Sequence, residues 1–179
     1  SKCARHLADM TDNADLAARI RTIPDYPKPG IMFRDVSTLL LDGPGFRQTI
    51  DRMAALVAPD TQLIAGIEAR GFIVAAGLSY ALGLGKLPGE KIGVDYQLEY
   101  GTDRIELHTG QVVPGQKVVL VDDLIATGGT ALAGIELIRQ AGGVVEQALF
   151  IVDLPELGGA EKLRAVGVEP TALIGFDGH

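Results

Sequence analysis

Two neighbouring acids and a run of small residues form the part of this sequence whose residue types and spacing could do chemistry. Asp122 and Asp123 end an apolar run, and residues 126–130 follow as Ala-Thr-Gly-Gly-Thr. Glycine lets a ligand approach the backbone closely, and successive N–H groups at a helix N-terminus form a site for an anion. The stretch therefore predicts an anion site, although it lacks the spacing of a Walker loop or of a dinucleotide-binding fingerprint.

Two carboxylates beside an anion site would repel the anion unless they face something else. The vicinal hydroxyls of a ribose fit, because each carboxylate oxygen can accept a hydroxyl proton. A magnesium ion held near Asp122 and Asp123 is also compatible with them. The local chemistry thus favours a ribose 5-phosphate group, and an ordinary strand-to-helix turn with polar ends remains the alternative.

Composition narrows the classes of protein. The chain has 179 residues, 47% of them hydrophobic, and 16 basic against 23 acidic residues give a net charge of −7. This balance argues against a general nucleic-acid binder. Cys3 is the only cysteine, so no internal disulfide can form. Without a signal-peptide core or a membrane-spanning apolar run, we expect a cytoplasmic protein that does not contact membranes.

Strands are predicted to alternate with helices along the chain. The apolar patterns favour helices over 12–22, 42–59, 70–85, 129–141 and 158–166, and strands over 62–69, 104–110, 116–123, 144–154 and 170–176, with a polar loop over 86–103. Such alternation predicts an α/β fold, a mainly parallel twisted sheet flanked by helices, here as a single domain over 1–179. Ligands of such sheets bind beyond the carboxyl ends of the strands, where the acid pair would lie.

The acid-pair segment also resembles a known family. "VVLVDDLIATGGT" (118–130) is similar to the phosphoribosyl-diphosphate (PRPP) signature of the type I phosphoribosyltransferases. Residues 23–40 and 65–72, "KLPGE" (86–90) and residues 95–108 resemble the adenine branch of that family. The resemblance covers about residues 14–166. It implies an N-terminal hood segment at about 12–40, a PRPP-binding core at about 60–176 and a mobile active-site loop.

The resemblance also implies an activity and a site. The activity is formation of AMP and diphosphate from adenine and PRPP with Mg²⁺, in a protein that is typically a homodimer. Glu99 and Arg70 would be catalytic, and Met32, Phe33, Arg34 and Leu154 would contact adenine. The PRPP-binding residues would be Glu68, Ala69, Arg70, Lys86, Tyr100, Asp122, Asp123, Ala126, Thr127, Gly128, Gly129 and Thr130.

Three alternatives stay open. A sister enzyme could use hypoxanthine or xanthine instead of adenine, although residues 23–40 argue against it. A regulator with this fold could bind PRPP or a purine without catalysis. An acid-pair phosphoacceptor domain has the same sheet class but would not need Thr-Gly-Gly-Thr beside the acids.

One segment is shorter than the resemblance implies. The family has an apolar strand and an Arg-Lys pair before "KLPG", whereas this chain passes directly from Gly85 to Lys86. The alternation of helices and strands also asks for a strand there. Either the segment is deleted, or the sequence omits residues that the protein contains between these two positions, and of the two we favour the omission.

Overall fold

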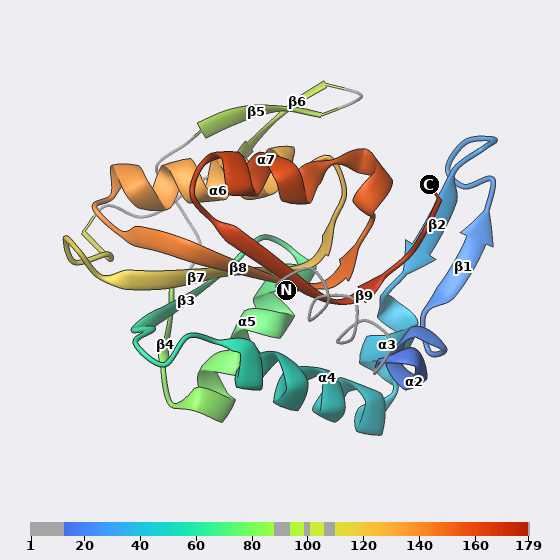
Figure 1. Cartoon of the computed structure of the whole chain (residues 1–179), viewed down its shortest axis with the longest axis horizontal. Coiled ribbons are helices and arrows are strands. Elements are labelled where there is room, and N and C mark those ends of the chain that lie inside the picture. Colours follow the sequence, from blue (N-terminus) through green and yellow to red (C-terminus); the bar gives the residue numbers. More distant parts are fainter. Residues whose placement is uncertain (1–12, 88–93, 99–100, 106–109, 179) are drawn as a thin grey trace, which may run out of the picture.

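The computed structural model describes residues 13–87, 94–98, 101–105 and 110–178, and its centre is a five-stranded parallel sheet (Figure 1). The strand order is β4-β3-β7-β8-β9. The strands are β3 (Leu63–Gly66), β4 (Gly85–Leu87), β7 (Lys117–Ile125), β8 (Val144–Asp153) and β9 (Glu169–Gly175). The predicted fold class, a parallel sheet flanked by helices, is confirmed.

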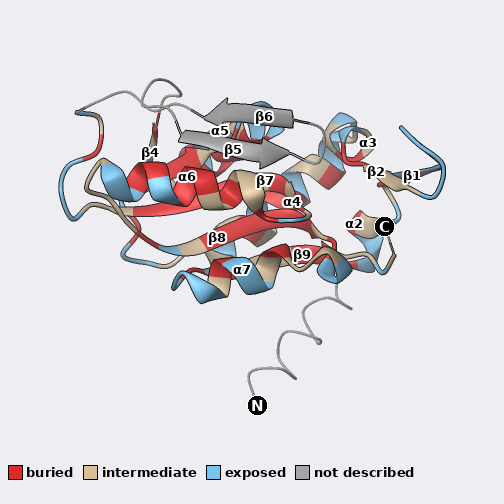
Figure 2. Ribbon diagram, turned by 90° about the horizontal axis from the view of Figure 1, so that it is seen from above, coloured by how far each residue is buried: buried red, intermediate tan, exposed pale blue. Residues whose placement is uncertain are grey.

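Helices cover both faces of this sheet. One face carries α4 (Gly43–Leu56) and α5 (Arg70–Leu82), and the other carries α6 (Gly129–Gln140) and α7 (Gly159–Ala165) (Figure 1). Successive residues of β7 point to opposite faces, so Val119 and Val121 enter one half of the core while Val118 and Leu120 enter the other. This double burial explains the uninterrupted apolar run of the strand, and Figure 2 shows the buried residues gathered along the sheet.

The N-terminal segment forms a small hood beside the sheet. It contains α2 (Ala14–Ala17), the antiparallel strands β1 (Arg21–Pro24) and β2 (Met32–Asp35), and α3 (Ser37–Leu41). The predicted helix over 12–22 is wrong beyond its first turns, because Thr22 and Ile23 pair with Arg34 and Phe33 in a hairpin. The hairpin stands at the end of the sheet where β9 finishes (Figure 1).

The segment predicted as a polar loop over 86–103 contains strands instead. β5 (Val94–Leu98) and β6 (Gly101–Ile105) pair as an antiparallel hairpin that lies along α6 (Figures 1 and 2). Val94, Tyr96 and Leu98 alternate with Asp95 and Gln97, a period-2 pattern typical of a strand that the interpretation of this segment as a loop overlooked.

Gly85 and Lys86 are consecutive residues of this sequence, and the expected omission between them stays a prediction. Both residues belong to β4, which pairs in parallel with β3. The strand required by the alternation therefore exists, but it is only three residues long. Among the described residues, no helix is long and apolar enough to span a membrane.

Candidate active site

A cavity of about 530 Å³ lies at the carboxyl ends of β3, β7 and β8, with the hood on its other side. It is lined by Glu68, Ala69 and Arg70 after β3, by residues 122–131 along and after the end of β7, by Leu154 and Leu157 after β8, and by residues 31–34 of the hood. Segments from four parts of the sequence thus meet at one opening, where parallel sheets bind ligands.

The acid pair is divided between two environments. Asp123 is 5% exposed, and its Oδ2 accepts a hydrogen bond from Nε of Arg70. This pairing raises the pKa of Arg70. The side chain of Arg70, which lines the cavity, remains 52% exposed. Because a guanidinium carries five N–H donors, the ion pair leaves others for a ligand. The salt bridge and a ligand-binding role are therefore compatible.

Asp122 has no such ion pair within the described part of the chain. Its Oδ1 accepts the backbone N–H of Asp123 at 2.8 Å. Burial, followed by the neighbouring charge of Asp123, raises the pKa of the Asp122 carboxyl to about 8. Asp122 therefore holds a proton more readily than an ordinary carboxylic acid, and a nearby cation would favour its release.

The predicted anion loop has the required geometry. Gly128 adopts φ 81° at the N-cap of α6, a conformation that a side chain would strain, and backbone N–H groups at the start of this helix point outward. Gly159 packs behind the loop: its N–H donates to the carbonyl of Ala126 at 3.0 Å. A Cβ at Gly159 would lie 2.4 Å from that oxygen, so the close approach requires glycine.

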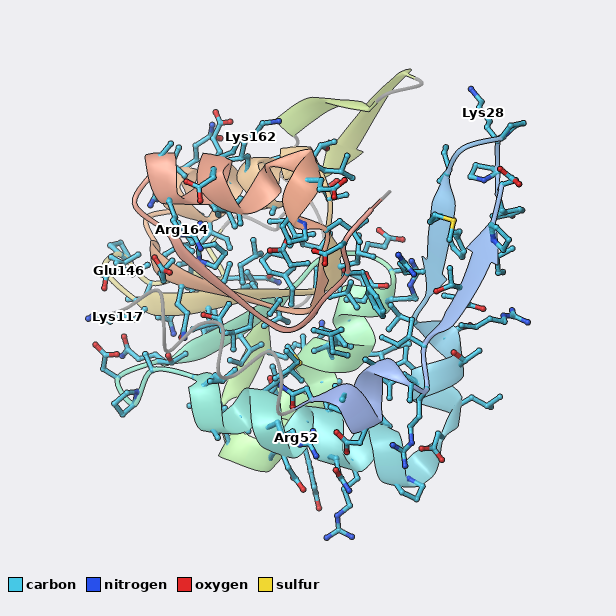
Figure 3. The ribbon with its side chains drawn as sticks, turned by 45° about the vertical axis from the view of Figure 1, so that its right-hand side comes forward. Lys28, Arg52, Lys117, Glu146, Lys162 and Arg164 are labelled. Carbon is cyan, nitrogen blue, oxygen red and sulfur yellow. The ribbon has the colours of Figure 1, made fainter. Side chains whose placement is uncertain are left out.

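Lys162 also supports this loop, which the sequence did not indicate. Its Nζ donates to the carbonyl of Thr127 at 3.0 Å. Lys162 extends from α7 on a different side from Arg164, whose guanidinium pairs with Glu161 and lies 3.6 Å from Glu169 (Figure 3). Lys162 therefore holds one loop carbonyl and brings a positive charge to the anion site.

The hood contributes an aromatic side chain to the cavity. Phe33 is half-buried, and its ring meets that of Tyr26 edge-to-face at 5.2 Å between centroids. Met32, Arg34 and Leu154 line the same cavity, so all four residues predicted to contact the base are brought together. The lining residues that the sequence did not single out are Ile31, Leu124, Ile125, Ala131 and Leu157, all apolar and four of them next to a predicted one.

Among the predicted residues that the structure describes, Lys86 is the one that does not line this cavity. Lys86 is half-buried on β4, its Nζ donates to the carbonyl of Leu87 at 3.2 Å, and burial lowers its pKa. The ammonium lies 4.4 Å from the ring centroid of Phe72. Glu99 and Tyr100 lie outside the described residues, so their roles stay predictions.

The described residues would hold Mg²⁺ only together with a ligand. No group of three His, Cys, Asp or Glu side chains in this part of the chain could bind a metal ion. Asp122 and Asp123 still present carboxylate oxygens at the cavity. Since Mg²⁺ is commonly held by one or two carboxylates, water and substrate phosphates, the pair fits a magnesium ion that arrives with a phosphorylated substrate.

Comparison with known proteins agrees with this geometry. Residues 37–162 match the phosphoribosyl transferase domain. An adenine phosphoribosyltransferase of Erythrobacter litoralis is 57% identical over 175 positions, which cover 92% of this chain and 98% of that protein. Because 92% of 179 residues is about 165, about ten of the 175 aligned positions hold no residue of this chain.

Solved structures are similar over nearly the whole chain. The crystal structure of adenine phosphoribosyltransferase from Thermoanaerobacter pseudethanolicus has a TM-score of 0.84 and 42% identity, covering 91% of this chain and 99% of that one. The enzyme from Saccharomyces cerevisiae, complexed with an imino-altritol bisphosphate and adenine, has a TM-score of 0.80 and 30% identity, with 92% and 99% covered.

The raised pKa of Asp122 predicts a pH-dependent stability. Between the ordinary value of 3.8 and about 8, the folded protein holds a proton that the unfolded chain releases. The stabilisation is complete below the lower value and is lost as pH rises through the upper one, with a slope approaching ~1.4 kcal/mol per pH unit. Asp122→Asn removes this contribution, so urea unfolding should show the variant gaining stability relative to wild type as pH rises. Parallel pH profiles would contradict the assignment.

The contact of Lys162 with Thr127 predicts weaker anion binding when it is removed. We expect Lys162→Met to lower the affinity for ribose 5-phosphate about 2- to 5-fold, the usual worth of one exposed charge. Isothermal titration calorimetry measures this. Arg164→Met is the matched control on the same helix, because Arg164 pairs with acids of its own neighbourhood. Equal losses in both variants would show a general charge effect and no specific role for Lys162.

Proposed function

The chain belongs to the adenine phosphoribosyltransferases, enzymes of purine salvage that form AMP and diphosphate from adenine and PRPP, and we propose that the cavity between its hood and its sheet edge carries out this reaction. One observation carries the proposal: the anion loop, the acid pair, Arg70 and the hood aromatic all line the same cavity. Each of these four features is proposed to contact a different group of the substrates: the 5-phosphate, the ribose hydroxyls, the diphosphate or the base.

The phosphate end of PRPP is proposed to bind residues 126–130. The backbone N–H groups at the start of α6 and the hydroxyls of Thr127 and Thr130 are the donors, with Lys162 behind them. The ribose hydroxyls then face Asp122 and Asp123, which precede the loop on β7. Ionised carboxylates accept hydrogen bonds from both ribose hydroxyls, so ribose binding favours the deprotonated form of Asp122.

The diphosphate of PRPP is proposed to lie against Glu68, Ala69 and Arg70. These residues follow β3, the strand next to β7, and Arg70 keeps free N–H groups that can grip two phosphate oxygens. Magnesium would neutralise part of the diphosphate charge as that group leaves. This chain lacks the Arg-Lys pair that the family resemblance implies before Lys86, so Arg70 would carry a larger share of diphosphate binding.

Adenine is proposed to lie between the hood and the end of β8. Phe33 can stack on one face of the base and Leu154 can cover the other, while Met32 and Arg34 complete the wall. Stacking of a base on an aromatic ring is worth about 1–3 kcal/mol. In this orientation N9 of adenine faces C1 of the ribose, the carbon at which positive charge develops as diphosphate departs.

Glu99 and Tyr100 are proposed to act from the loop between β5 and β6. A carboxylate near the base can manage the proton of adenine in the transition state, help that is worth roughly 10²–10⁴ in rate. Closure of this loop over the substrates would exclude water, which would otherwise hydrolyse PRPP. The protein is further proposed to be a cytoplasmic homodimer; Ile73 and Tyr80, exposed on one face of α5, support an apolar contact between copies.

The function is tested by incubating the protein with PRPP, Mg²⁺ and single bases. We expect AMP from adenine and little product from hypoxanthine or xanthine, measured by chromatography of the nucleotides. The reason is that residues 31–34 form the base wall, and this segment resembles the adenine branch. If hypoxanthine is turned over faster than adenine, the protein is the sister enzyme that uses hypoxanthine. If PRPP binds but no nucleotide is formed from any base, the non-catalytic regulator is favoured.

Replacing Glu99 tests the proposed proton transfer. Glu99→Gln should lower kcat at least about 10²-fold and change KM for adenine much less, because proton handling matters most in the transition state. Steady-state kinetics with adenine as the varied substrate separates the two constants. If only KM changes, Glu99 binds the base and does not act as an acid or base.

A further inference from the structure

Phe176 and Asp177, the two residues after β9, contact the hood, and no sequence pattern indicated a role for either of them. The ring centroid of Phe176 lies 4.4 Å from Cζ of Arg34, a distance at which a guanidinium is attracted to a ring face. Nη2 of Arg34 also donates to the carbonyl of Asp177 at 3.1 Å. The end of the central sheet is thereby attached to β2, the hood strand that carries Phe33.

Arg34 transmits this contact across the hood hairpin. Its Nη1 donates to Oγ1 of Thr22 on β1 at 2.7 Å, so one side chain joins both hood strands to Phe176. Its Nε is buried without a hydrogen-bond partner in the described part of the chain, so the ring of Phe176 and two hydrogen bonds hold the guanidinium. The position of Arg34 therefore depends strongly on Phe176.

Phe176 is also joined to the opposite wall of the cavity. The backbone N–H of Phe176 donates to the carbonyl of Asp153 at 3.1 Å. Leu154, which follows Asp153, donates its backbone N–H to the carbonyl of Ile125 at 3.0 Å. The ring of Phe176 packs on the core beside these strands. Phe176 contacts Arg34, the neighbour of Phe33, and Asp153, the neighbour of Leu154. It therefore lies between the two walls of the cavity and is one residue removed from each.

We propose that Phe176 is a positioning residue for the purine base, which fixes the separation between the Phe33 and Leu154 walls through Arg34. The proposal rests on the proposed function, because it assigns those walls to adenine. A planar base needs contact on both faces at once, so a hood that moves relative to β8 loses stacking. The anion loop and the acid pair are not among the contacts that Arg34 makes with Phe176, Asp177 and Thr22, so PRPP binding should not depend on the Arg34–Phe176 contact.

Three variants separate this role from core packing. Phe176→Leu keeps an apolar side chain and removes the ring face, so KM for adenine should rise about 3- to 30-fold with KM for PRPP unchanged. Phe176→Tyr keeps the ring and should restore adenine KM to within about 2-fold of wild type. Phe46→Leu is the matched control, because Phe46 on α4 is also half-buried and packs on the same core. It should leave adenine KM unchanged at a similar loss of thermal stability.

Hydrogen exchange supplies a readout that is independent of catalysis. Amides of β2 should exchange faster in Phe176→Leu than in wild type, and should not do so in Phe46→Leu. If the wild-type chain forms no AMP from adenine, the proposed function fails and the exchange comparison alone decides whether Phe176 holds the hood. Equal exchange in the two variants, or an equal rise of both KM values in Phe176→Leu, would overturn the proposal.

Discussion

Two adjacent carboxylates at the end of a buried strand cannot both remain ionised without nearby positive charge, and this requirement organises the candidate site. Arg70 provides the charge for Asp123, while Asp122 responds to burial and to its neighbour with a pKa of about 8. Because Arg70 opens α5 and Asp123 lies on β7, their ion pair also fixes the segment after β3 against the next strand. The same contact thus balances charge and sets the geometry that we propose for diphosphate beside ribose.

The anion loop depends on a second, purely steric constraint. Gly128 has a positive φ, and a Cβ there would lie 2.9 Å from Cα of Gly159. The hydrogen bond from Gly159 to Ala126 and that from Lys162 to Thr127 come from the same segment at the start of α7. The loop that we propose for the phosphate end of PRPP is therefore supported by residues about thirty positions further along the chain. This separation gives the loop a fixed backing that a short turn alone would lack.

The base side of the cavity is built differently from the phosphate side. Its two walls belong to separate units, the hood hairpin and the end of β8, so their spacing depends on contacts between those units. Arg34 and Phe176 supply such a contact close to the cavity.

The sequence by itself determined the parts of this protein whose information is local. The apolar run before Asp122, the glycines of residues 126–130 and the alternation of strands with helices sufficed for the parallel sheet and for the strand end that carries the anion loop, because periodicity and backbone freedom are properties of neighbouring residues. The resemblance to a family then supplied Phe33, Arg34 and Leu154, which the cavity brings together. Only the tertiary structure decided the rest. The strand over 21–24 and the short β4 form because a partner strand lies alongside, and no local pattern records that partner. The pairing of Arg70 with Asp123, the contact of Lys162 with Thr127 and that of Phe176 with Arg34 join residues 53, 35 and 142 positions apart, and such long-range contacts exist only once the chain has folded.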